Sequence, residues 1–266
     1  MRQVASVIPQ AKPWTLNRRS RERIISFLSP IALLLLWEVL ARLGILDTRF
    51  FPAPSQILST LLTMMTSGEL LDDTLISMTR LAVGFLVGGI PALIIGVVMG
   101  LNSTLRAMID PLIAATYPIP KSSILPLALL VLGLGEASKI FMVAIGVFYP
   151  IAMNSMAGVR EINRVYLDVG HNFKAGRWDV FRTIALPGAM PMIMTGVKLG
   201  VGMGLVLIAI AEMVGAKSGL GYLIWNAWET FAVDQMYVGL FVIALIGFAL
   251  TLILNELEKI LVPWKP

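Results

Sequence analysis

The segment VREINRVYLDVGHNFKAGRWDVFRTIALPGAMPMIMTGVKLGVGMGLVLIAIAEM, residues 159–213, decides how the chain is organised. Its first half is a polar interval between two apolar segments, and the sequence turns apolar again around Pro187 and Pro191. The interval carries five basic residues, Arg160, Arg164, Lys174, Arg177 and Arg182. Apolar residues recur at helical spacing at Tyr166, Val169 and Phe173, and again at Trp178, Phe181 and Ile184. This spacing predicts two short amphipathic helices that are joined by a turn at Gly176. We expect this basic hairpin to lie at the inner membrane surface and to present one face to a partner.

Composition places the chain among integral membrane proteins. Hydrophobic residues make up 57% and charged residues 14% of the chain, and the mean hydropathy is +0.83. Several apolar runs approach the length of about 20 residues that a helix needs to cross a bilayer. With no cysteine and a single histidine, His171, we expect neither a disulfide framework nor a metal centre. The net charge of +5 is explained by the basic loops, so we expect no nucleic-acid partner.

The apolar runs predict an all-α protein with about six transmembrane helices. The expected spans cover residues 24–46, 76–101, 122–134, 140–159, 190–214 and 237–254. The first span is too long for a cleaved signal segment, so we expect an uncleaved anchor. The third span is short, and Pro118, Pro120 and Pro126 interrupt its approach. Such a broken segment must tilt or be sheltered inside the protein.

Lys and Arg residues in the connecting segments set the expected orientation. A cytoplasmic N-terminus places most basic residues inside, among them Arg106, Lys259 and Lys265, and leaves little beyond Arg49 and Lys217 outside. We therefore expect a multi-pass protein of the bacterial plasma membrane with both termini in the cytoplasm. Residues 1–23 form a basic arm, residues 24–259 one transmembrane domain with a coupling loop at 160–186, and residues 260–266 a tail. On the outer surface we expect a short helix over residues 56–65, capped by Ser55.

Glycines recur at intervals of four residues inside the expected spans. They are Gly84 with Gly88, Gly96 with Gly100, and the series Gly196, Gly200 and Gly204. This spacing permits close contact between helices, and packing within one subunit is its usual role. Gly202 adds a second small face to the fifth span, which favours a thin helix wall beside a path or a subunit interface. We assign Gly202 and its neighbour Met203 to the expected translocation path.

Ionisable residues inside the spans are functional candidates because their burial is costly. Lys198 and Glu212 lie about 21 Å apart along one helix, so they cannot pair with each other. We expect Lys198 to be a lone electropositive point on the path, which is stable only where it meets water, a carboxylate or a passing anion. Glu212 is expected either in a structural ion pair or near an outer gate. Arg80 is expected to reach the outer headgroups, and Glu136 to pair locally with Lys139.

The sequence indicates no catalysis within this chain. Its hydroxyl groups have no base beside them, and no glycine-rich phosphate loop is followed by Lys and Ser or Thr. We therefore expect no cofactor in this chain, and any energy input must come from another polypeptide.

An ordered series of stretches resembles the permease subunits of bacterial ATP-binding cassette importers of the nitrate, sulfonate and taurine type. The stretches are FFPAPSQIL at 50–58, SMTRLAVGF at 77–85, LGLGEASKIF at 132–141, IALPGAMPMIMTGVKLGVG at 184–202 and AEMVGAKSGLGYLIWNAWE at 211–229. The resemblance implies a type I importer fold with a second permease copy and two cytoplasmic ATPase subunits that bind ATP and Mg²⁺. It also implies a periplasmic or lipid-anchored solute-binding protein.

The same family carries a cytoplasmic signature of Glu-Ala-Ala, three residues, Gly, and a spacer ending in Ile-x-Leu-Pro. Aligned on Ile184, Leu186 and Pro187, the first triplet falls on Asp168, Val169 and Gly170, and the glycine position falls on Lys174. Gly176 is the alternative carrier of the turn. The resemblance implies that the hairpin docks into a groove of the ATPase. The coupling residues would be Tyr166, Asp168, Val169, Gly170, Phe173, Lys174, Gly176, Trp178, Phe181, Leu186 and Pro187.

Three other function classes stay open at this point. They are the membrane component of a vitamin-type importer, a membrane scaffold without transport, and, least favoured, a membrane enzyme. A scaffold would explain the apolar composition but not the hairpin that leads into Pro187 and Pro191. Within the resembling family the expected solute is a small anion, such as nitrate, bicarbonate or an organic sulfonate including taurine.

Overall fold

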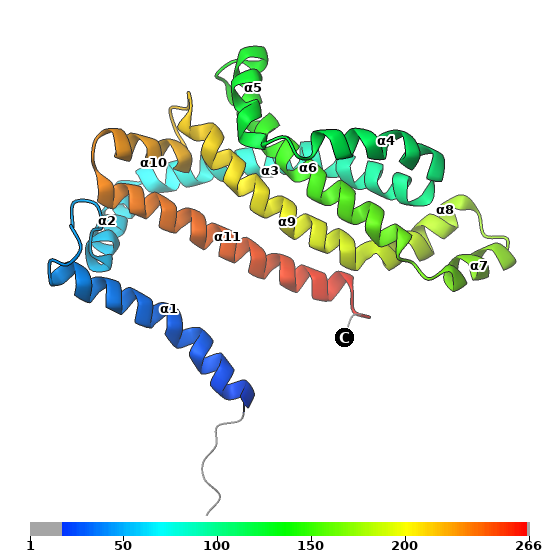
Figure 1. Ribbon diagram of the computed structural model, residues 1–266, viewed down its shortest axis with the longest axis horizontal. Helices are drawn as coiled ribbons and strands as arrows, with labels where there is room; N and C mark the ends of the chain where they lie inside the picture. The colour runs from blue at the N-terminus through cyan, green and yellow to red at the C-terminus, as the bar shows by residue number, and fades with distance from the viewer. Residues whose placement is uncertain (1–17, 265–266) are drawn as a thin grey trace, which may run out of the picture. The chain divides into compact units, whose positions relative to one another are not determined.

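The computed structural model describes residues 18–264, so most of the expected basic arm and the end of the tail lie outside the described residues. The chain divides into two compact units, Met1–Gln56 and Ile57–Pro266. Every regular element described in residues 18–264 is helical (Figure 1). The all-α fold predicted from the apolar runs is therefore confirmed.

The first unit contains α1 (Arg18–Arg42) and the start of α2 (Pro54–Ser67). Helix α1 covers most of the first expected span. Helix α2 begins at Pro54, so Ser55 lies inside the helix, and the prediction that Ser55 caps a helix starting at residue 56 is wrong. The backbone N–H and the hydroxyl of Ser55 donate to the carboxylate of Glu38 at 2.9 and 2.8 Å. Proline suits the first turn of a helix because a backbone N–H at that position would have no acceptor within the helix, so its absence costs nothing.

The second unit contains the remaining long helices. They are α3 (Glu69–Leu101), α4 (Ser103–Thr116), α5 (Leu125–Leu132), α6 (Glu136–Arg160), α9 (Leu186–Met213), α10 (Leu220–Glu229) and α11 (Val233–Leu261). Four described helices are long and apolar enough to cross a membrane: α3, α6, α11, and the continuous helix Trp178–Met213 that includes α9. With the broken pair below, the described residues contain up to five candidate spans, against the six expected.

The approach to the third expected span is broken, as its prolines predict. Helix α4 ends at Thr116, and a 3₁₀ turn, η1 (Lys121–Ile124), leads into α5. The segments Ser103–Thr116 and Lys121–Leu132 meet at an angle of 88°. Pro118 and Pro120 lie in the connection, where they donate no backbone hydrogen bond. Neither α4 nor the segment Lys121–Leu132 is a candidate span by itself, but the two together are long and apolar enough to count as one.

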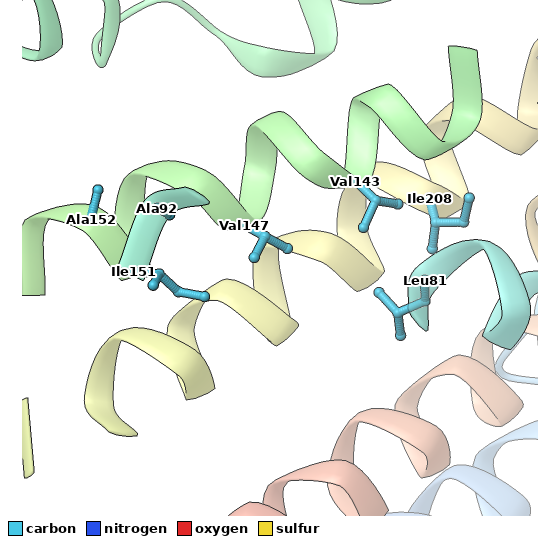
Figure 2. Packing of buried hydrophobic residues seen from close by; sticks show 7 residues of the cluster. All are labelled: Leu81, Ala92, Val143, Val147, Ile151, Ala152 and Ile208. Carbon is cyan, nitrogen blue, oxygen red and sulfur yellow. The ribbon is translucent and has the colours of Figure 1, made fainter. Parts of the chain in front are cut away.

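Helices α3, α6 and α9 form the centre of the second unit. Figure 2 shows Leu81 and Ala92 of α3 against a row of α6 side chains from Val143 to Ala152, with Ile208 of α9 at one end. A Cβ atom on Gly88 would lie 2.2 Å from the carbonyl oxygen of Ala144. Close approach of two helix backbones therefore depends on this glycine, and the packing role predicted for the glycine rows is confirmed for α3.

A second group of buried side chains joins α2, α3, α10 and α11. Its members are Met64, Leu70, Leu220, Leu223 and Val238. The hydroxyl of Thr60 in α2 donates to Asp234 at the start of α11 at 2.8 Å. This group lies toward the end of the unit that contains the first turn of α3 and the first turn of α11.

Candidate functional site

The polar interval folds into the helical hairpin that the apolar spacing predicts. Helix α7 spans Arg164–Asn172, and α8 spans Arg177–Val180. Gly170 is buried, and a Cβ on it would lie 3.0 Å from Cδ1 of Ile184. This small residue lets α7 pack closely against the segment that follows α8, so the two arms of the hairpin are in contact.

The turn of the hairpin is built around Lys174 rather than Gly176. Lys174 has a φ of 51°, in the left-handed region where glycine is usual. The N–H of Ala175 donates to the carbonyl oxygen of Gly170 at 2.9 Å, the bond that defines a Schellman ending of a helix. The alternative in which Gly176 carries the turn is wrong, because Lys174 itself adopts the conformation that the signature glycine would supply. Gly176 instead donates its N–H to Asp179 at 3.2 Å.

The hairpin turns aromatic and apolar side chains outward. Phe173 is 84% and Trp178 68% exposed, and Tyr166 and Val169 are exposed as well. Asp168 is exposed on the same helix. Exposed apolar side chains in an otherwise polar loop mark a surface that a partner can cover. The side chains expected to dock are thus accessible, and their contact with an ATPase stays a prediction.

A continuous helix connects the hairpin to α9. The segment Phe181–Ala185 (η2) is a π-helix, and the N–H of Leu186 donates to the carbonyl oxygen of Phe181. Pro187 has no N–H for the carbonyl four residues earlier, so the regular ladder is interrupted here. Phe181 stacks on Trp178 with ring centroids 5.2 Å apart. Phe181 and Leu186 also pack against the buried cluster that contains Ala189. Phe181 therefore anchors the hairpin to the transmembrane helices.

Lys198 in α9 is not the lone cation that the sequence suggested. Its ammonium forms an ion pair with the carboxylate of Glu258 near the end of α11. Both side chains are partly buried. Of the partners expected for this ammonium, the structure therefore supplies a carboxylate, which comes from α11, 60 positions away. Its placement on a translocation path stays a prediction.

One face of α9 remains uncovered in the described chain. Thr195, Leu199, Gly202, Met203 and Val206 are all exposed. They follow one another at intervals of four, three, one and three residues, so they share one side of the helix. A Cβ on Gly202 would meet no atom within 4 Å, unlike Cβ atoms on Gly200 and Gly204. The two glycine faces of α9 thus differ, and the expected path residues Gly202 and Met203 lie on the open one.

Glu212 lies at the opposite end of α9 in a buried polar cluster. It is 1% exposed, and its carboxylate accepts from Arg80 of α3 at 2.8 Å and from the hydroxyl of Ser77. The structural ion pair, one of the two alternatives for Glu212, is what the structure contains. A role of Glu212 on the path stays a prediction.

Arg80 and Lys139 differ from their expected roles. Arg80 is 5% exposed and donates to Glu136 at 2.6 Å, so the expectation that it reaches the headgroups is wrong. Lys139 is buried and donates to the carbonyl oxygens of Leu134 and Gly135 at 2.8 and 3.0 Å. Glu136 and Lys139 therefore do not form the expected local pair, because each is engaged by a nearer partner.

Sequence reasoning missed two buried polar features. Asp73 and Ser77 precede Arg80 at intervals of four and three, a helical spacing that was readable in the sequence. Lys121 is buried at the break between α4 and α5, where its ammonium donates to the carbonyl oxygens of Thr116, Tyr117 and Ile119. Carbonyl groups at the end of a helix attract a cation. Lys121 thus provides hydrogen bonds to backbone carbonyl groups at the break between α4 and α5.

The described residues combine these features with no candidate metal site. Across residues 18–264, no group of three His, Cys, Asp or Glu side chains is placed to hold a metal ion. The described features are an exposed hairpin, a continuous helical junction to α9, an open face of α9, and a buried ionic cluster at the far end of α9.

Comparison with known proteins points to membrane transport. The sequence profile of the family described as "Binding-protein-dependent transport system inner membrane component" matches residues 92–265. The taurine transport system permease protein TauC of Escherichia coli is 35% identical, over 92% of this chain and 91% of the relative. The putative aliphatic sulfonates transport permease protein SsuC of Escherichia coli is 32% identical, over 92% and 93%. The nitrate import permease protein NrtB of Synechocystis is 30% identical, over 70% and 68%.

Proposed function

Since the chain belongs to the inner-membrane components of binding-protein-dependent transport systems, we propose that it is the permease subunit of an ATP-driven importer of a small anion. The hairpin α7–α8 carries this proposal, because it exposes Phe173 and Trp178 and continues without a break into α9. A partner that moves the hairpin would therefore move a membrane-crossing helix with it.

The proposed assembly contains two permease copies, two cytoplasmic ATPases and an external solute-binding protein. ATP and Mg²⁺ bind to the ATPases, and this chain supplies the path. The open face of α9 at Gly202 and Met203 supports a contact with the second copy or with the solute. Both termini and the hairpin lie in the cytoplasm in this arrangement, in agreement with the positive charge of the loop.

The proposed solutes are organic sulfonates including taurine, nitrate and bicarbonate. The names of the relatives support the first two classes. Uptake of labelled taurine, nitrate and bicarbonate by cells that express the proposed ATPase and binding-protein partners, with and without this chain, tests the class. If cells that contain this chain take up none of the three anions, as cells without it do, the proposal of anion import is refuted.

Charge reversal on the hairpin tests the proposed coupling. Asp168 is exposed on α7, and Asp168→Arg should uncouple ATP hydrolysis from uptake without disturbing membrane insertion. Glu161→Arg is the matched control, because it reverses an exposed charge just outside α7. Equal uptake by the two inserted variants would show that Asp168 does not contact the ATPase.

Copurification tests the proposed assembly. Mild detergent should extract two copies of this chain with two ATPases when all subunits are coexpressed. A permease that elutes as a monomer without ATPase under those conditions would contradict the assembly and favour a scaffold.

A further inference from the structure

The guanidinium of Arg80 joins three helices, α3, α6 and α9, to the loop before α10. Its Nε and Nη2 donate to the carboxylate of Glu136 at the start of α6, both at 2.6 Å. Its Nη1 donates to Glu212 of α9 and to the backbone carbonyl of Ser218, both at 2.8 Å. A guanidinium has five N–H donors, and these bonds engage four of them. Arg80 therefore links protein groups to one another, and only one of its N–H donors remains for a solute anion.

The same face of α3 caps the first turn of α10. The N–H of Gly219 donates to Asp73 at 2.7 Å, and the N–H of Leu220 donates to the hydroxyl of Ser77 at 2.8 Å. The N–H of Gly221 donates to Glu212 at 3.0 Å. The opening N–H groups of a helix have no partner within the helix. Here side chains from α3 and α9 satisfy them, so the position of α10 is set by two neighbouring helices.

Two glycines make this close approach possible. Gly219 has a φ of 114°, and a Cβ on it would lie 2.4 Å from Cδ of Glu212. A Cβ on Gly221 would lie 2.2 Å from the carbonyl oxygen of Ala209. Any larger side chain at either position would push the loop away from the carboxylate that holds it.

The cluster lies at the end of the helices that is remote from the hairpin. Glu136 is the first residue of α6, whereas the hairpin follows the last residue of α6. A helix of 25 residues is about 37 Å long, which is more than the thickness of the hydrocarbon core. If the hairpin is cytoplasmic, as the proposed function states, the cluster lies at the outer mouth.

We propose that the Arg80 cluster, comprising Asp73, Ser77, Arg80, Glu136 and Glu212, holds residues 214–221 and the first turn of α10 in a fixed position at the outer mouth. Its members are thereby positioning residues for the delivery of solute from the external binding protein. This inference rests on the proposed function. The cluster thus acts where the solute is received from the binding protein, and not along the path by which the solute crosses the membrane.

The expected kinetic effect follows from population arithmetic. If the loop is held, nearly every copy is competent to receive the solute-loaded partner. If a hydrogen bond of the clamp is lost, only a fraction of copies is competent, and the apparent affinity falls by that fraction. The half-saturating concentration for uptake should then rise, while the maximal rate per inserted copy stays close to that of the wild type.

A single thiol can report whether the loop is held. The chain contains no cysteine, so Ser218→Cys introduces one near-isosteric reporter in the held segment. A membrane-impermeant maleimide, added from outside to right-side-out vesicles that contain the whole transporter, should label it slowly. Adding Asp73→Ala should raise the labelling rate about tenfold, since a charged hydrogen-bond partner is lost. Ser77→Ala should act in the same direction and serves if Asp73→Ala does not insert.

Matched variants separate the clamp from general destabilisation. Asp72→Ala makes the same substitution at the exposed neighbouring residue and should leave the labelling rate unchanged. Asp73→Asn keeps an acceptor oxygen for the N–H of Gly219 and should restore slow labelling. Equal labelling rates for Asp73→Ala and Asp72→Ala would overturn the proposal.

Uptake gives the functional result. With labelled taurine or nitrate, whichever the wild type imports, Asp73→Ala should raise the half-saturating concentration about tenfold, with the maximal rate per copy within about twofold. A fall in maximal rate at unchanged half-saturation would overturn the positioning role. Labelling only from the cytoplasmic side, or no uptake by the wild type, would refute the proposed function, and the labelling ratio would still test whether the cluster holds the loop.

Discussion

Replacing Gly88 by alanine should test whether the glycine row of α3 determines helix packing. A Cβ at this position would lie 2.2 Å from the carbonyl oxygen and 2.6 Å from Cα of Ala144. Both contacts are with backbone atoms, so no side chain can rotate away. An ordinary carbon–oxygen contact requires about 3.4 Å, so α3 and α6 would have to separate by about 1 Å.

The magnitude follows from two opposing effects. Overpacking of this kind costs about 1–3 kcal/mol, and the separation also loosens the contacts of Val143 and Val147 on both sides. The higher helix propensity of alanine returns at most about 1 kcal/mol. We therefore expect Gly88→Ala to lower the free energy of unfolding by about 1–2 kcal/mol.

Gly202→Ala is the matched control, because it makes the same substitution in another transmembrane helix. A Cβ on Gly202 meets nothing within 4 Å, so the free energy of unfolding of the monomer should stay the same or rise slightly. Unfolding can be followed by tryptophan fluorescence during titration with a denaturing detergent in mixed micelles, since the chain has six tryptophans. If Gly88→Ala were as stable as Gly202→Ala, the close contact between α3 and α6 would not exist as described.

Three further outcomes are expected. Lys174→Gly should raise the free energy of unfolding by about 1 kcal/mol in the same titration, because glycine adopts a φ of 51° without steric cost; no gain would contradict a left-handed turn residue. Arg80→Met should lower the free energy of unfolding by about 3–5 kcal/mol by leaving Glu212 buried without its cation, and adding Glu212→Leu should recover part of the loss. Failure of the double variant to recover would assign the loss to packing. Lys198→Met should reduce anion uptake several-fold, whereas Glu258→Gln, which keeps the ammonium, should not; equal reduction by both would assign the effect to the ion pair alone.

The hairpin and the broken third span could be predicted from the sequence because their causes are local. Apolar residues three and four positions apart predict α7 and α8 from the local sequence, without knowledge of the neighbouring helices. Proline removes a backbone donor at its own position, so the break after Thr116 follows from Pro118 and Pro120 alone. The residue that carries the hairpin turn could not be chosen in this way, because local preference favours Gly176 over Lys174. The structure places the left-handed residue at Lys174, two residues after the end of α7.

The partners of the charged residues could not be predicted, because they come from distant parts of the chain. Arg80 finds Glu136 and Glu212 at separations of 56 and 132 residues. The sequence shows that a charge within a span needs compensation, but it does not show which helix supplies it. Reaching the headgroups is the cheapest solution for an arginine on an isolated helix, and it becomes unnecessary once two carboxylates are within hydrogen-bonding distance.

The ion pairs near the middle and at the last turn of α9 change what its open face can do. Lys198 and Glu212 are both engaged within the described chain, so the exposed face between them presents Leu199, Met203 and Val206. An apolar wall offers an anion no tight binding, and tight binding inside a path would slow release. Recognition of the solute would then be better placed outside the membrane, where the further inference places the Arg80 cluster and the loop before α10. Under the two proposals above, α9 would have two tasks: its first turns would carry the movement of the hairpin, and its last turn would fix the surface at which the solute arrives.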